Sequence, residues 1–132
     1  MHIKSKRKWV FIPAEIKVRD FQSRALIATK LASRGYGVVL GSHVQINRYI
    51  DEFPGGAYFD KSISINKYDY FKELKRKHCI VSIDEEGLSA FNNYEKFITK
   101  RVSRRMLDLT ELYFCWGNLE RQMILDKYPN TN

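Results

Sequence analysis

The stretch Cys79-Ile80-Val81-Ser82-Ile83-Asp84-Glu85-Glu86-Gly87 joins a continuous apolar run to three consecutive acids and a glycine. A short apolar run that ends in a turn is typical of a buried strand in a parallel sheet. The acids then lie at the carboxyl end of that strand, where a side chain that can take or give a proton is a candidate general acid or base. Asp84, Glu85 and Glu86 are therefore the candidate catalytic residues. The alternative is that these acids cap the next helix or offset its dipole.

The rest of the chain repeats this alternation of strand and helix. Apolar runs predict strands at residues 9–13, 37–41, 57–59, 79–83 and 112–116. Helical spacing predicts a helix that Asp20 opens and Gly35 closes, and its buried face carries Phe21, Ala25, Ala28 and Ala32. Further helices are predicted at residues 44–53, 68–78, 94–100 and 103–109. A last helix is predicted from Asn118, as its cap, to residue 128. Continuously apolar strands that alternate with helices indicate an α/β fold: a doubly wound, mainly parallel sheet of about five strands with helices on both faces, a Rossmann-like three-layer sandwich.

Length and composition fit one globular domain. The chain has 132 residues, of which 44% are hydrophobic, and we expect a single Rossmann-like domain over residues 1–132 with its core at 7–129. No run approaches the roughly 18 apolar residues of a membrane span, and no signal-peptide core follows the basic start, so a cytoplasmic location is expected. Cys79 and Cys115 lie in apolar runs and are expected as free thiols, without a disulfide or a metal site.

The positive charge indicates an anionic partner but does not identify which kind. The formal net charge is +8, with basic clusters at residues 4–8, 72–78 and 96–105. Such a field attracts phosphates on nucleic acid, on an anionic membrane surface or on a nucleotide-linked substrate. The clusters lack the interleaved aromatic residues of a nucleic-acid-binding module and also fit the solvated faces of helices, so no specific nucleic-acid binding is expected.

The sequence lacks the motifs of several well-known classes of α/β protein. The turn after the first strand, Pro13-Ala14-Glu15-Ile16-Lys17, has no glycine to let backbone approach a pyrophosphate, which disfavours NAD or FAD. A phosphate-binding loop ending in Gly-Lys-Ser/Thr is absent as well. A phosphoacceptor receiver domain would carry its acids after the first and third strands, whereas this chain concentrates them after the fourth. No cofactor is expected.

Ligands of doubly wound sheets bind in the crevice beyond the carboxyl ends of the strands. The loops at that edge are predicted at residues 13–20, 41–43, 60–62, 84–87 and 116–118. They supply the candidate substrate-binding residues Glu15, Lys17, Arg19, Ser42, His43, Lys61, Gly87, Trp116 and Asn118. The three charged residues after the first strand could hold a sugar or a phosphate, or could simply pair with one another in water.

The candidate residues of the loops after the second and fifth strands also have both a binding and a structural interpretation. Ser42 and His43 resemble an anion site at a helix start, but His43 is equally compatible with an ordinary position beside a helix cap. Trp116 offers an aromatic face for a sugar ring or a base, next to the amide of Asn118. It is equally compatible with a place in the core.

Five motifs in order carry a family resemblance: Lys8-Trp9-Val10-Phe11-Ile12-Pro13, Gly35-Tyr36-Gly37-Val38-Val39-Leu40-Gly41, Phe59-Asp60-Lys61-Ser62, Asp84-Glu85-Glu86-Gly87 and Trp116-Gly117-Asn118. With them the chain resembles bacterial surface carbohydrate biosynthesis proteins, which look like glycosyltransferases of the two-domain GT-B type. The resemblance spans residues 4–129. It implies a role in building capsule, lipopolysaccharide or a related glycan on the cytoplasmic side of the membrane.

The resemblance also implies partners and roles. In the GT-B architecture the N-terminal domain mainly binds the acceptor, here a glycan or lipid-linked molecule, and the C-terminal domain binds the nucleotide-sugar donor. The chain stops after five strand-helix units, so we expect it to be the N-terminal half of a longer protein and inactive alone. Glu85 or Glu86 would accept the acceptor's proton or act as nucleophile, Lys61 would hold a phosphate or carboxylate, and the basic clusters would contact anionic membrane. The competing hypothesis is a non-catalytic α/β module that binds an anionic ligand or a protein partner.

Overall fold

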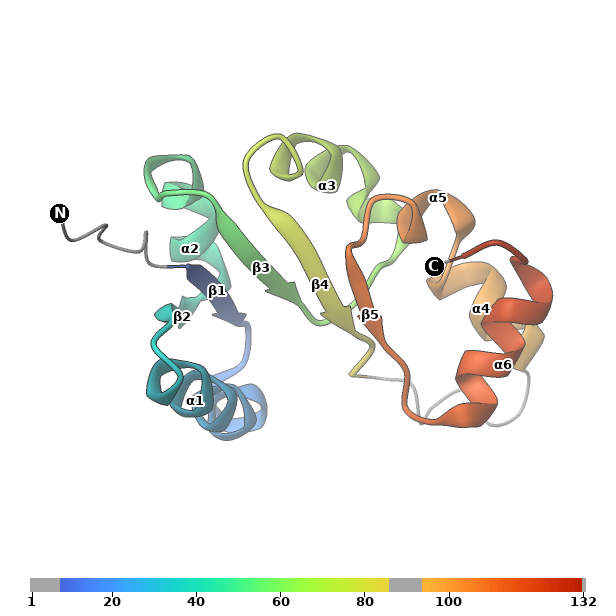
Figure 1. Ribbon diagram of the computed structural model, residues 1–132, viewed down its shortest axis with the longest axis horizontal. Helices are drawn as coiled ribbons and strands as arrows, with labels where there is room; N and C mark the ends of the chain where they lie inside the picture. The colour runs from blue at the N-terminus through green and yellow to red at the C-terminus, as the bar shows by residue number, and fades with distance from the viewer. Residues whose placement is uncertain (1–7, 86–93, 132) are drawn as a thin grey trace, which may run out of the picture. The chain divides into compact units, whose positions relative to one another are not determined.

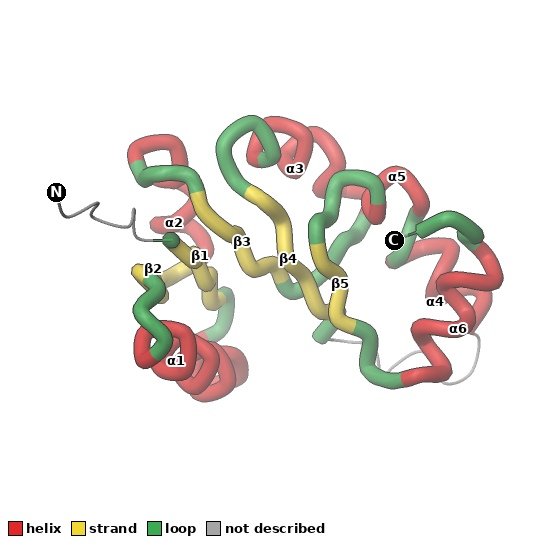
Figure 2. Tube along the Cα trace, in the orientation of Figure 1, coloured by secondary structure: helices red, strands yellow, loops and turns green. Residues whose placement is uncertain are grey.

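The computed structural model describes residues 8–85 and 94–131 (Figure 1). Helices and strands alternate along the trace (Figure 2). In chain order they are β1 (Trp9–Ala14), α1 (Lys17–Ser33), β2 (Gly37–Ser42), α2 (His43–Tyr49), β3 (Gly56–Asp60), α3 (Tyr68–Leu74), β4 (Cys79–Ile83), α4 (Tyr94–Arg101), α5 (Arg104–Leu107), β5 (Leu112–Phe114) and α6 (Asn118–Lys127), with short 3₁₀ helices at Ile50–Glu52 and Ile65–Lys67.

The strands form a five-stranded sheet of order β2-β1-β3-β4-β5. β1 pairs in parallel with β2 and with β3, and β4 pairs in parallel with β5. The connection from β1 leads to one side and the later connections lead to the other, so the winding reverses beside β1 and β3. The predicted α/β fold class is confirmed.

Contacts along the chain cluster into two compact units, which we call unit 1 (Met1–Phe59) and unit 2 (Asp60–Asn132). In unit 1, α1 and α2 lie on opposite faces of the β1–β2 pair (Figure 1). Phe11 and Ile12 of β1 are fully buried, and the ring of Phe11 lies 5.2 Å from that of Phe53. These contacts give unit 1 its apolar centre.

Two glycines flank Trp9 at the start of β1. Trp9 is in register with Gly37 of β2 and with Gly56 of β3. A Cβ atom at Gly37 would lie 2.6 Å from the indole ring, and one at Gly56 would lie 2.4 Å from the Trp9 carbonyl oxygen. Both positions therefore require glycine because a neighbouring residue occupies the space of a side chain.

Unit 2 has its own apolar centre. Its buried residues include Phe71 of α3, Ile80 of β4, Ile98 of α4, Val102 between α4 and α5, and Met106 of α5. In contrast, Leu112 and Phe114 of β5, and Trp116 in the loop after it, expose about half of their surface. We call these three alternate residues the apolar row. None of the described helices is long and apolar enough to cross a membrane.

Several predicted details were wrong. α1 begins at Lys17 rather than Asp20, and its most buried residues are Asp20 and Arg24, whereas Phe21 and Ala32 are exposed. Strand β2 is a half-buried edge strand because only its first residue is fully covered. The predicted helix at 44–53 is α2 followed by a 3₁₀ turn, α3 stops at residue 74, and β5 stops at residue 114.

Candidate functional site

Three strand ends of unit 2 are joined by hydrogen bonds into one polar cluster. The backbone N–H of Glu85, just after β4, donates to the carbonyl of Lys61, just after β3, at 3.1 Å. The indole N–H of Trp116, just after β5, donates to the carbonyl of Asp84. Lys61, Asp84, Glu85 and Trp116 therefore lie together at the carboxyl edge of the sheet, where parallel sheets bind ligands.

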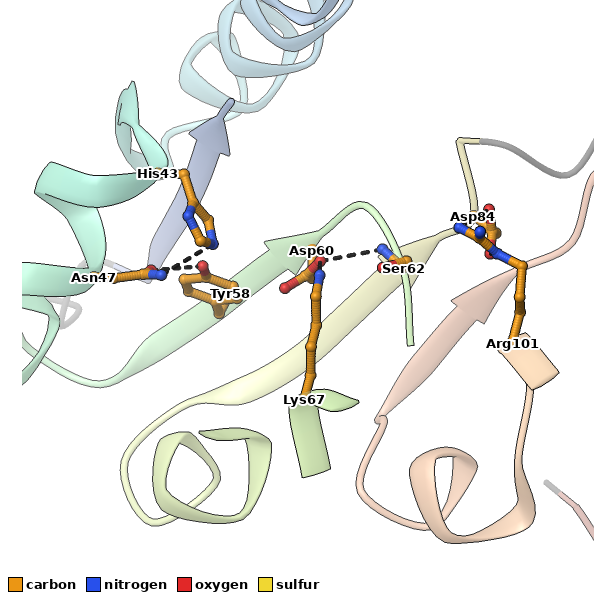
Figure 3. A network of polar contacts seen from close by, with 8 residues as sticks. All are labelled: His43, Asn47, Tyr58, Asp60, Ser62, Lys67, Asp84 and Arg101. Carbon is orange, nitrogen blue, oxygen red and sulfur yellow. Dashed lines mark hydrogen bonds and ion pairs between the residues drawn. The ribbon is translucent and has the colours of Figure 1, made fainter. Parts of the chain in front are cut away.

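Asp84 is fixed by a buried ion pair. Its side chain is fully buried, and its two carboxylate oxygens accept hydrogen bonds from Nε and Nη2 of Arg101 at 2.7 and 3.2 Å (Figure 3). Arg101 is the last residue of α4 and is 30% exposed. The two-point contact holds α4 against the end of β4 and leaves Asp84 poorly placed to meet a substrate.

A second buried carboxylate ends the neighbouring strand. Asp60, the last residue of β3, is 2% exposed. Its Oδ1 accepts from the backbone N–H of Ser62 at 3.1 Å and from Nζ of Lys67 at 2.5 Å (Figure 3). Within the described part of the chain, its Oδ2 has no hydrogen-bond partner.

Glu120 organises the end of β5. It lies in the first turn of α6, and its two oxygens accept from the backbone N–H of Trp116 at 2.6 Å and from the hydroxyl of Tyr113 at 3.0 Å. Burial, with the nearby Glu120 charge, raises the pKa of the Tyr113 phenol. Asn118 was expected to cap this helix, but the N-cap is Gly117, and no side-chain hydrogen bond caps the helix.

Trp116 lies in the loop after β5 and is 49% exposed, which excludes the alternative of a place in the core. Its indole N–H is used on the Asp84 carbonyl, whereas about half of the side chain remains open to solvent. Cys115 and Cys79 are half-buried free thiols. Burial raises the pKa of Cys115 to about 11 and also raises the pKa of Cys79.

The candidate residues of unit 1 surround Asp20. Oδ2 of Asp20 accepts from the backbone N–H groups of Glu15 and Ile16 at 3.2 and 3.0 Å, and its Oδ1 accepts from Nε of Arg19 at 2.7 Å. The hydrogen bond from Arg19 outweighs burial and lowers the pKa of Asp20 to about 2. Arg19 thus pairs with a buried acid that the sequence analysis named only as the start of the helix, and Lys17 is the first residue of α1.

Ser42 and His43 lie at the same edge of unit 1, because Ser42 ends β2 in register with the end of β1. The Ser42 hydroxyl accepts from the backbone N–H of Gln45 and caps α2. His43 Nε2 lies 3.0 Å from Nδ2 of Asn47, and the hydroxyl of the fully buried Tyr58 donates to Oδ1 of Asn47 at 2.7 Å (Figure 3). His43 is therefore tied into a half-buried network that reaches the buried Tyr58, and it is more than a neighbour of the cap.

The predicted residues fall into two groups, one in each unit. Unit 2 brings together Lys61, Asp84, Glu85 and Trp116, with Asn118 starting the adjacent α6. Unit 1 places the others beside the ends of β1 and β2. Glu86 and Gly87 lie outside the described residues.

Sequence reasoning assigned no role in the site to four charged residues: Asp20, Asp60, Arg101 and Glu120. Asp60 was expected in the loop after the third strand, but it is the last residue of β3. Asp20 and Glu120 could have been found from the preference for an acid in the first turn of a helix. Arg101 lies in the basic cluster at residues 96–105, which also fits the solvated face of a helix, so nothing in the sequence distinguished it from its neighbours.

The chemistry of this edge is that of carboxylates and cations. In the described ranges, no three His, Cys, Asp or Glu side chains are placed to hold a metal ion. The pair formed by Asp60 with Lys67 instead suits hydrogen bonding to a polar organic ligand, whereas Arg101 occupies both oxygens of Asp84. No family model, curated protein or solved structure matches the chain.

Proposed function

We propose that the chain is the acceptor-side domain of a glycosyltransferase-like protein in bacterial surface polysaccharide biosynthesis, for capsule or lipopolysaccharide. The observation that carries the proposal is the cluster of three strand ends in unit 2, in which Glu85 is held by the Lys61 carbonyl. A half-buried acid on a fixed backbone at the carboxyl edge of a parallel sheet is well placed for proton transfer to or from a bound ligand.

The residues of the cluster take different roles in this proposal. Asp84 is a positioning residue, because Arg101 occupies both of its oxygens. Glu85 is the candidate base that accepts the proton of an acceptor hydroxyl while the hydroxyl oxygen attacks the anomeric carbon of the donor sugar and the nucleotide leaves. Trp116 stacks against a sugar ring, since its N–H anchors it to the protein and half of its surface stays open.

The proposed partners follow from this role. A glycan or lipid-linked acceptor binds at the carboxyl edge, with Lys61 on an anionic group of the acceptor. The nucleotide-sugar donor binds a second, C-terminal domain. The exposed basic residues Lys72, Lys75 and Arg105 would make peripheral contact with the anionic inner face of the membrane, which would place the protein at the cytoplasmic surface.

Deletion of the gene in the source bacterium tests this function. The capsule and lipopolysaccharide of the deletion strain are compared on gels before and after complementation with the wild-type gene, Glu85→Gln or Glu73→Gln. The wild type and Glu73→Gln should restore the polysaccharide, since Glu73 is an exposed acid of α3 outside the cluster. Glu85→Gln should not restore it. An unchanged polysaccharide in the deletion strain would refute the proposal.

The apolar row on β5 favours a second candidate, a non-catalytic α/β module that binds a protein partner. Exposed apolar residues on a short edge strand are a common contact surface for another chain. In that case Glu85→Gln would restore the polysaccharide, whereas Phe114→Lys, which places a charge in the row, would not. The same complementation experiment therefore separates the two candidates.

A further inference from the structure

Asp60 is an incompletely satisfied carboxylate at the ligand-binding edge of the sheet. Its Oδ1 has two donors, the Ser62 backbone and Lys67, whereas the buried Oδ2 has no partner within the described residues. Asp84 shows the contrast, since Arg101 satisfies both of its oxygens. Of these two carboxylates at neighbouring strand ends, only Asp60 has an oxygen without a donor among the described residues.

An unpaired oxygen of this kind calls for a physical explanation. A buried acceptor without a donor costs about 1–3 kcal/mol, and more when it carries charge, so native proteins rarely keep one without a reason. Asp60 also ends β3, one of the two strands beside which the winding of the sheet reverses. The carboxyl edge at such a reversal is where open α/β sheets bind their ligands.

The chemistry of the pair selects the class of ligand. Oδ2 of an ionised carboxylate only accepts hydrogen bonds, so it needs a hydroxyl or amine donor. Lys67 is 24% exposed and has three N–H groups, of which one is used on Asp60. An acceptor beside a donor matches two neighbouring hydroxyls of a sugar. A phosphate would suit Lys67 but would be repelled by Asp60, and a metal cation would be repelled by Lys67.

We propose that Asp60 and Lys67 form a subsite for a vicinal pair of hydroxyl groups on a neutral sugar. One hydroxyl donates to Oδ2 of Asp60, and the oxygen of its neighbour accepts from Nζ of Lys67. Because Oδ2 is itself buried, the side chain of Lys67, the more exposed member of the pair, has to shift to admit the ligand. The inference rests on the proposed function, because this sugar would belong to the acceptor.

The backbone amide of Ser62 reports on the subsite directly, because it donates to the other oxygen of the same carboxylate. The ¹⁵N-labelled chain is titrated with methyl glucoside, methyl galactoside, N-acetylglucosamine and, separately, inorganic phosphate, while the Ser62 and Lys67 amide signals are followed. At least one glycoside should shift both signals saturably. Asp60→Asn and Lys67→Met should each weaken that binding about tenfold or more. Asp69→Asn, which removes an exposed acid of α3, should leave binding unchanged.

The outcomes are decisive in each direction. No shift with any glycoside, a shift with phosphate alone, or wild-type affinity in both subsite variants overturns the inference. If Asp60→Asn fails to fold, the wild-type titration and Lys67→Met still decide it. Glycoside binding combined with a normal surface polysaccharide in the deletion strain would refute only the proposed function. A polysaccharide defect without glycoside binding would refute only this subsite.

Discussion

Replacement of Arg101 by methionine isolates the energetic value of the buried ion pair with Asp84. Methionine keeps much of the length and the apolar contacts of the arginine stem but removes the charge and both hydrogen bonds, which measure 2.7 and 3.2 Å. The change leaves a fully buried carboxylate without its cation. We expect the free energy of unfolding to fall sharply.

The expected loss follows from burial on each side of the pair. Two unit charges about 4 Å apart attract by about 4 kcal/mol at an effective dielectric constant of about 20, and breaking a buried pair typically costs about 3–5 kcal/mol. Arg101 is 30% exposed, so water can partly solvate the abandoned carboxylate. Arg101→Met should therefore cost about 3 kcal/mol, near the lower end of that range.

The chain provides a matched control in Arg104. Its Nε lies 2.9 Å from Oδ1 of Asp108, a similar distance, but the two side chains are 44% and 57% exposed. Exposed pairs contribute about 0.2–1 kcal/mol, so Arg104→Met should cost about 0.5 kcal/mol. Urea unfolding followed by Trp116 fluorescence in a Trp9→Phe background reports on unit 2, because only one tryptophan remains.

A double variant tests the cause of the loss. Asp84→Asn with Arg101→Met removes both charges, so it should lose about 2 kcal/mol less than the sum of the single variants. Equal losses for Arg101→Met and Arg104→Met would show that burial does not strengthen this pair. Additive losses in the double variant would show that the two side chains do not interact, and either result would refute the reasoning.

Other changes probe features away from that pair. Gly56→Ala should lower the free energy of unfolding in urea by about 1–3 kcal/mol, because its Cβ would lie 2.4 Å from the Trp9 carbonyl oxygen. Gly117→Ala, whose Cβ would have open space around it, should lower the free energy of unfolding less. Asp20→Asn should destabilise by about 2 kcal/mol at neutral pH. Because its folded-state pKa is lowered to about 2, the difference from wild type should disappear as the pH falls from about 4 to about 2 in acid unfolding curves. Cys115, whose pKa is raised to about 11, should react with iodoacetamide at pH 8 far more slowly in the folded chain than in urea, as measured by mass spectrometry.

The sequence predicted the fold well because the relevant signal is local. Each strand is a short apolar run, and each is followed by a helix, so the order of elements could be inferred without any knowledge of contacts. The exposure of the strands could not be inferred in the same way. Strands β2 and β5 look as apolar as the central strands but lie at the edges of the sheet, and position in a sheet depends on pairing between distant segments.

The candidate site was predicted as a set of loops but not as a set of interactions. Lys61, Asp84, Glu85 and Trp116 do come together, because the carboxyl ends of parallel strands share one edge. Their roles depend on partners that are distant in the sequence. Arg101 lies 17 residues from Asp84 and gives that acid a structural contact that three consecutive acids do not suggest.

The hydrogen bonds between Tyr58, Asn47 and His43 have a direction. Tyr58 donates to the oxygen of the Asn47 amide, so the amide nitrogen donates to Nε2 of His43 and the proton of the neutral ring must reside on Nδ1. A phenol in the core of unit 1 thereby selects the tautomer of a histidine at the edge of β2, and the two residues act on each other only through the side chain of Asn47.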